Sequence, residues 1–175
     1  TKGVEGTRVL LDGRILSWPR DDTLRLWDGS SGEALATLEG HTHWASGATA
    51  LADGRILSWS YDHTLRLWDS SSGETLATLE GHTDSAWGAT VLSDGRILSW
   101  SNDHSLRLWD GPSGEALATL EGHTKGVEGT RVLLDGRILS WSRDDTLRLS
   151  DGPSGAALAT LEGHTPRAPG PTPLA

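Results

Sequence analysis

The chain has 175 residues, no cysteine and a formal net charge of −9, which argues against a nucleic-acid partner because such binding depends on Lys and Arg neutralising phosphates. No apolar run approaches the roughly 20 residues needed to span a bilayer, and no charged segment followed by an apolar one opens the chain as a secretory signal would. We therefore expect a soluble protein without a membrane contact or a disulfide framework, whose compartment stays open and which is cytoplasmic if it is native.

The chain contains four copies of one repeat unit. The tripeptide Gly-His-Thr begins at Gly40, Gly81, Gly122 and Gly163, which sets a period of 41 residues. A unit of this size cannot bury its apolar faces alone and is stable only when it stacks on copies of itself. We expect four units, at residues 1–42, 43–83, 84–124 and 125–165, followed by a proline-rich tail or linker at 166–175.

Each unit predicts four short antiparallel strands. In the second unit they cover residues 47–51, 55–59, 64–68 and 74–80. The segments between them are rich in Asp, Gly and Ser, as turns are in antiparallel sheets. Helical spacing of apolar residues is not sustained anywhere in the chain, so the prediction is an all-β fold.

Four-stranded units of about 40 to 45 residues, with Gly-His at one end and Trp-Asp at the other, resemble the repeats of the WD-repeat family. Trp-Asp begins at Trp27, Trp68 and Trp109, and Asp-Gly recurs in every unit. The resemblance covers nearly the whole chain up to Thr165. It implies a β-propeller with four four-stranded antiparallel blades per chain, a half-ring that a second chain completes.

The resemblance also implies a buried polar tetrad in each blade: the Gly-His histidine, a second-strand serine, an aspartate of the following turn and the Trp-Asp tryptophan. The fourth unit has Ser150 in place of the tryptophan, and no histidine precedes the first unit. Because His164 serves no later blade, we expect it to complete the first tetrad of a second chain. Carried over residue by residue, the tetrad positions are Ser17, Asp21 and Trp27; His41, Ser58, Asp62 and Trp68; His82, Ser99, Asp103 and Trp109; and His123, Ser140 and Asp144.

Ser, His and Asp together can also indicate a hydrolase triad. Catalysis needs one strained set that solvent can reach, whereas a hydrogen-bonded set copied into every unit is what buried polar groups require. We therefore predict a structural role, no catalytic activity and no cofactor. His41 and His43 could indicate a metal, but two histidines without a carboxylate or cysteine partner make a poor zinc site, and we predict none.

A further tryptophan follows the tetrad serine of every unit, where the family usually has a small residue. We interpret these side chains as core, since the swap keeps the total volume when the facing first strand carries smaller residues. The tryptophans are Trp18, Trp59, Trp100 and Trp141, and the smaller residues that we expect to compensate are Val9, Ala50, Val91 and Val132.

The units differ most in two loops, one before the first strand and one between the second and third strands. The resemblance places both on one face, around the mouth of the channel, and we call them the top-face loops. One interpretation is drift of exposed turns; the other is a binding surface, because large aromatics are frequent at interface hot spots. The candidate binding residues are Arg20, His43, Trp44, Tyr61, His63, Trp87, Asn102, His104 and Arg143.

Two functions therefore remain open. The first is a self-assembling scaffold, a natural fragment or an engineered repeat protein, that closes an eight-bladed ring as a homodimer. The second is a platform that binds a protein or peptide through the top-face loops, as WD-repeat proteins commonly do. The start at Thr1 without Met and the near-repetition of the units favour a fragment or an engineered chain.

Overall fold

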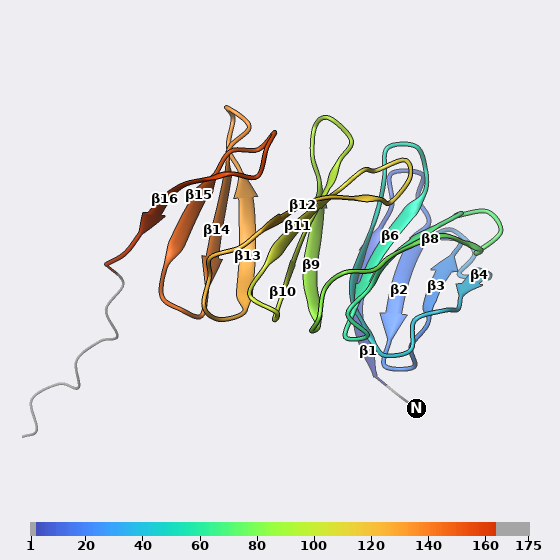
Figure 1. The fold of residues 1–175 in the computed structure, drawn as a ribbon. Coiled ribbons are helices and arrows are strands. Elements are labelled where there is room, and N and C mark those ends of the chain that lie inside the picture. Colours follow the sequence, from blue (N-terminus) through green and yellow to red (C-terminus); the bar gives the residue numbers. More distant parts are fainter. Residues whose placement is uncertain (1–2, 164–175) are drawn as a thin grey trace, which may run out of the picture.

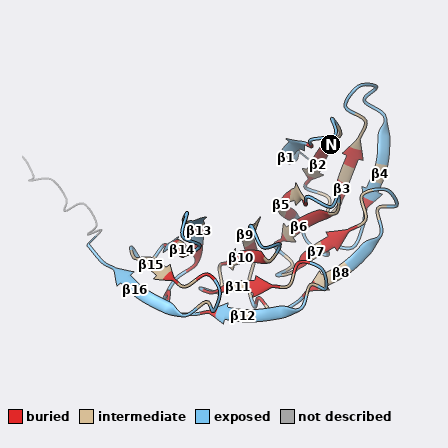
Figure 2. Ribbon diagram, turned by 90° about the horizontal axis from the view of Figure 1, so that it is seen from above, coloured by how far each residue is buried: buried red, intermediate tan, exposed pale blue. Residues whose placement is uncertain are grey.

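The computed structural model describes residues 3–163, and the regular structure of this part is entirely strand. The strands form four antiparallel sheets, each built from four consecutive strands in chain order. The sheets, which we call blades 1 to 4, stand side by side (Figure 1). Seen from above, they follow an open arc with the first strand of each blade on the inner side (Figure 2). The strands are β1 (Val4–Val9), β2 (Ile15–Pro19), β3 (Leu24–Trp27), β4 (Ala34–Leu38), β5 (Ala45–Ala50), β6 (Ile56–Ser60), β7 (Leu65–Trp68), β8 (Thr75–Leu79), β9 (Ala86–Val91), β10 (Ile97–Ser101), β11 (Leu106–Trp109), β12 (Ala116–Leu120), β13 (Val127–Val132), β14 (Ile138–Ser142), β15 (Leu147–Ser150) and β16 (Ala157–Leu161).

These sheets confirm the all-β, four-bladed prediction. In the second unit, β5 to β8 begin and end within two residues of the predicted strands. Each sheet lies inside one of the four predicted units, and the tail at 166–175 lies outside the described residues. No helix long and apolar enough to cross a membrane occurs in residues 3–163.

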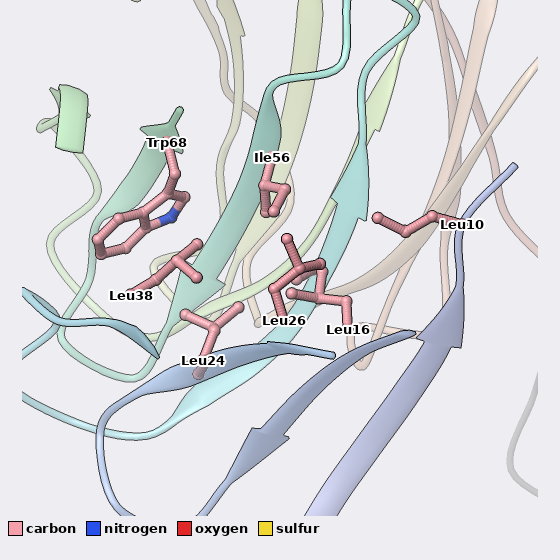
Figure 3. Close-up of a cluster of buried hydrophobic side chains, with 9 residues drawn as sticks. Leu10, Leu16, Leu24, Leu26, Leu38, Ile56 and Trp68 are labelled. Carbon is pink, nitrogen blue, oxygen red and sulfur yellow. The ribbon is translucent and has the colours of Figure 1, made fainter. Parts of the chain in front are cut away.

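Three apolar cores join the blades, each between two neighbouring sheets. One blade contributes leucines of its second, third and fourth strands, and we call this side the Leu face. The next blade contributes residues of its first two strands, including an isoleucine, and in blades 2 and 3 also the Trp-Asp tryptophan of the third strand; we call this side the Ile/Trp face. Figure 3 shows the junction of blades 1 and 2, with Leu16, Leu24, Leu26 and Leu38 against Ile56 and Trp68.

The aspartate of Trp-Asp fixes the turn to the outer strand. Asp69 Oδ1 accepts hydrogen bonds from the backbone N–H groups of Ser71 and Ser72, both at 2.8 Å, and from the Ser71 hydroxyl. These bonds, the Ser71 hydroxyl first among them, lower the pKa of Asp69 to about 2. The carboxylate is therefore ionised at neutral pH and holds the β7–β8 turn.

The tryptophans that follow the tetrad serines lie over glycines. Trp59 pairs with Gly47 across the β5–β6 ladder, and a Cβ at Gly47 would stand 2.5 Å from the indole. The same pairing recurs in the other blades at Gly6, Gly88 and Gly129. The expected compensation by Val9 and its equivalents is wrong, because those residues face the isoleucine at the other end of the second strand. The volume of each indole is compensated by the missing side chain directly opposite.

This close approach predicts that Gly88→Ala destabilises the protein. A Cβ at Gly88 would overlap the Trp100 indole, and overpacking of this kind costs about 1 to 3 kcal/mol. Chemical denaturation of both proteins measures the difference. Gly3→Ala is the matched control, because no atom lies within 4 Å of its added Cβ. Equal stability of the two variants would show that the indole moves aside without cost.

Candidate functional site

The structure brings two complete tetrads together, one in blade 2 and one in blade 3. In blade 2, His41 Nδ1 lies 2.7 Å from Asp62 Oδ2, and His41 Nε2 lies 2.7 Å from Ser58 Oγ. Trp68 Nε1 donates to the same Ser58 Oγ at 2.8 Å. The loop before β5 is thereby tied to the second and third strands of its own blade.

Blade 3 repeats this geometry. His82 lies 2.8 Å from both Asp103 Oδ2 and Ser99 Oγ, and Trp109 Nε1 donates to Ser99 Oγ at 2.8 Å.

The hydrogen bonds of the tetrad all donate in one direction, from the tryptophan towards the aspartate. The Trp68 indole can only donate, so Ser58 Oγ accepts from it and gives its own proton to His41 Nε2. His41 Nδ1 then carries the ring proton and donates it to the Asp62 carboxylate. Every polar atom of this buried set has a partner, which is what an apolar environment requires.

The tetrad carboxylates are ionised. Burial raises the pKa of Asp62 and Asp103, but hydrogen bonds from His41 or His82, from neighbouring hydroxyls and from backbone N–H groups lower it by more. The pKa of both groups lies well below its usual range as a result. In blade 4, burial lowers the pKa of His123 more than Asp144 raises it, which favours the neutral imidazole there.

The tetrad of blade 4 lacks the indole. His123 lies 3.0 Å from Asp144 Oδ2 and 2.9 Å from Ser140 Oγ, while the buried Ser150 occupies the tryptophan position. Ser140 therefore receives no indole N–H.

In blade 1, Trp27 Nε1 donates to Ser17 Oγ at 2.8 Å, but Asp21 pairs with Arg25 Nη2 at 2.9 Å rather than with a histidine. His164, predicted to complete this tetrad in a second chain, lies outside the described residues.

The tetrads have the hydrogen-bond connectivity of a hydrolase triad, but their serines are not accessible to a substrate. Ser58 and Ser99 are completely buried, whereas a nucleophile has to reach its substrate. His43 does not join His41 in a ligand set, and no group of three or more His, Asp or Glu side chains in residues 3–163 is placed to hold a metal ion.

The two kinds of top-face loop lie together in every blade. Backbone hydrogen bonds join them, for example from Tyr61 N to Trp44 O at 3.0 Å and from Asn102 N to Ser85 O at 3.0 Å. Two tryptophans of these loops lie against arginines of neighbouring blades. The Arg20 guanidinium lies 5.2 Å from the ring centre of Trp44, and that of Arg143 lies 4.3 Å from the ring centre of Trp87.

The other candidates line the same face between these two pairs. His43 lies 5.2 Å from Trp44 and 5.8 Å from Tyr61, measured between ring centres. Asn102 Nδ2 donates to Asp84 Oδ2 at 2.8 Å.

His63 and His104 are exposed and share a positive φ of 72°. His, Asn and Asp are the non-glycine residues most often found in this conformation. These two histidines therefore have a backbone role that is independent of any ligand.

Sequence reasoning missed four arginines at the opposite end of the blades. Arg14, Arg55 and Arg96 each donate from Nη1 to a backbone oxygen of the next blade: Ser70 O at 2.9 Å, Pro112 O at 3.3 Å and Pro153 O at 3.1 Å. Each also pairs with the aspartate two residues earlier. We call these residues and Arg137 the clamp arginines. The recurring Asp-Gly-Arg was the available signal.

Comparisons with known proteins agree with this architecture. A family model described as "WD domain, G-beta repeat" matches residues 32–69 and 73–110, the two repeats whose tetrads are complete. The crystal structure of the WD40 β-propeller domain of Doa1 is similar, with a TM-score of 0.71 and 28% sequence identity over 89% of this chain and 52% of that one. The chain thus spans about half the length of this relative. No curated protein sequence matches.

Stacked four-stranded blades with these tetrads define a β-propeller, and the two repeat matches together with the structural match support a WD-repeat propeller family. Domains of this family are generally scaffolds or protein-interaction modules and are typically non-catalytic.

We predict that the tetrad of blade 4 is the weakest of the chain, because Ser150 stands in place of the tryptophan. Ser150→Trp should raise the melting temperature, because the indole buries apolar area and donates to Ser140. The mirror change Trp109→Ser should lower the free energy of unfolding by about 3 to 5 kcal/mol. Thermal and chemical unfolding measure the two effects, and an unchanged or lowered melting temperature for Ser150→Trp would mean that blade 4 has repacked around the serine.

Proposed function

We propose that the chain is a self-assembling scaffold, in which two copies close an eight-bladed ring head to tail. The observation that carries this proposal is the complementarity of the two ends of the arc. Blade 4 ends in a Leu face and blade 1 begins with an Ile/Trp face, the same two faces that pack together at each of the three internal junctions.

The Leu face of blade 4 is left open by the end of the arc. Leu161 is 48% exposed, whereas Leu38, its equivalent in blade 1, is completely buried. Trp141 of the same face is 39% exposed. Leu139, Leu147 and Leu149 are only half-buried. Exposed apolar patches of this kind mark interaction surfaces.

The Ile/Trp face of blade 1 is open in the same way. Val4 is 61% exposed, whereas the equivalent residues Ala45, Ala86 and Val127 are completely buried. Trp27 is half-buried, in contrast to the buried Trp68 of the next blade.

The last clamp arginine, Arg137, supports the same junction between blade 4 of one copy and blade 1 of the other, which we call the seam. The side chains of Arg14, Arg55 and Arg96 are 19 to 24% exposed, and each reaches the next blade. Arg137 keeps its pair with Asp135 but is 43% exposed, and no carbonyl of a following blade lies next to it within the described residues. In a closed ring it would reach the turn at residues 28–33 of the second copy.

Identical chains of four blades close rings only in multiples of four, and eight is the upper end of the usual range for propellers. Light scattering should therefore give twice the chain mass of 18.7 kDa. Ile15→Glu should shift the protein to monomer, because it buries an unpaired carboxylate in the seam. Leu35→Glu, on the exposed side of the outer strand β4, is the matched control and should leave the dimer intact. A monomeric wild-type chain at micromolar concentration would refute the proposal.

A second candidate function is a platform for a protein or peptide. It is favoured by the two Trp–Arg pairs and by the row of polar and aromatic side chains between them. Tryptophan, tyrosine and arginine are the residues most enriched at interface hot spots. Because these side chains differ between units whose strands are nearly the same, the variation is concentrated where a rigid scaffold presents its loops.

The platform predicts that peptides selected from an array lose binding at least tenfold when Trp44 and Trp87 are both replaced by Ala. Leu76→Ala is the control, since Leu76 is exposed on the outer strand β8, away from the top-face loops. Surface plasmon resonance measures the affinities, and selected peptides that bind the double variant as tightly as the wild type would contradict this function.

A further inference from the structure

An open-sided cavity of about 520 Å³ lies between blades 1 and 2, at the end opposite the top-face loops, and Val9 and Leu11 at its rim are largely exposed. Its walls come from the β1–β2 and β5–β6 turns and the strand ends beside them. No aromatic side chain takes part in the lining, whose apolar residues are Val9, Leu10, Leu11, Ala50, Leu51 and Ala52. The volume is in the usual range for small-molecule sites.

The cavity lies where the second unit departs from the others. Ala50 stands where units 1, 3 and 4 have Val9, Val91 and Val132, and Ala52 stands where units 1 and 4 have leucine. The two smaller side chains leave more room on the blade 2 side of the cavity. Ala50→Val would restore the side chain that the other units carry.

The charged groups at the cavity favour an anion. Asp12 is occupied by Arg14, which donates to it from Nε at 2.8 Å and holds its pKa below the usual range. Arg8 donates to Thr49 Oγ1 across the cavity and has no carboxylate partner among residues 3–163. The lining thus carries one uncompensated positive charge, in a chain whose net charge is −9.

The two turns at the cavity are closed by their own backbone hydrogen bonds. Leu10 N donates to Arg14 O, and Leu51 N donates to Arg55 O, both at 2.8 Å. Without an aromatic wall a flat ring has nothing to stack on. A flexible aliphatic group is the occupant that these walls suit.

We propose that this cavity binds an aliphatic carboxylate of medium chain length, with the carboxylate on Arg8 and the hydrocarbon chain between Val9 and Ala50. Hydrogen bonds between a guanidinium and a carboxylate are charge-assisted and can be bidentate. Each methylene that leaves water adds up to about fourfold in affinity. The site lies within one chain, so it does not depend on ring closure.

The test is calorimetric titration of the full chain with decanoate, butyrate and 1-decanol. Decanoate should bind, and butyrate should bind at least tenfold more weakly because it lacks most of the apolar chain. Decanol should also lose at least tenfold, because it cannot form the ion pair. The Arg8→Ala and Ala50→Val variants should each weaken decanoate binding by about tenfold or more.

Arg131→Ala is the matched control, because Arg131 has the repeat position of Arg8 in unit 4 but does not line the cavity. It should bind decanoate like the wild type. Absence of decanoate binding overturns the proposal, as does binding that both Arg8→Ala and Ala50→Val leave unchanged. Equal affinity for decanoate and 1-decanol overturns the assignment of Arg8 as the anchor.

Discussion

Each sheet of this protein is apolar on both faces, and neither face can be buried within the sheet itself. The leucines on one side and the isoleucine and tryptophan on the other are buried only when two blades meet. Burial of one such side chain stabilises by about 1.5 to 3 kcal/mol, so the faces of a junction together outweigh any single hydrogen bond. This pairing of unlike faces accounts for the arc, for the order of the blades and for the open face at each end.

The polar tetrads work inside this stack. They connect the loop before the first strand to the interior of its own blade, and in blades 2 and 3 they satisfy every polar atom that they bury. An unsatisfied buried group would cost about 1 to 3 kcal/mol. The blades can therefore bury these polar groups only because the network pairs them. Its two incomplete copies are in the end blades, where Arg25 pairs with Asp21 and where Ser150 replaces the indole.

The near-identical strands leave variation to the loops and to a few strand ends. On the top face this variation places Trp44 and Trp87 under arginines of the neighbouring blades. At the opposite end it replaces Val and Leu by Ala50 and Ala52, beside the cavity. A scaffold whose stability is spread over repeated junctions can carry such differences, because each one touches only its nearest neighbours.

The sequence by itself determined the repeat and the four short strands of each unit, because these depend on a period and on alternation that are read along the chain. The resemblance to the WD-repeat family implied the positions of the tetrads. It also located the missing indole at Ser150. Only the tertiary structure decided that Gly47 and its equivalents receive the second-strand indoles, that Arg25 pairs with Asp21, and that Arg14, Arg55 and Arg96 reach the next blade. These contacts join residues from different strands or different units, and their partners depend on register and on the angle between blades, which no local pattern contains.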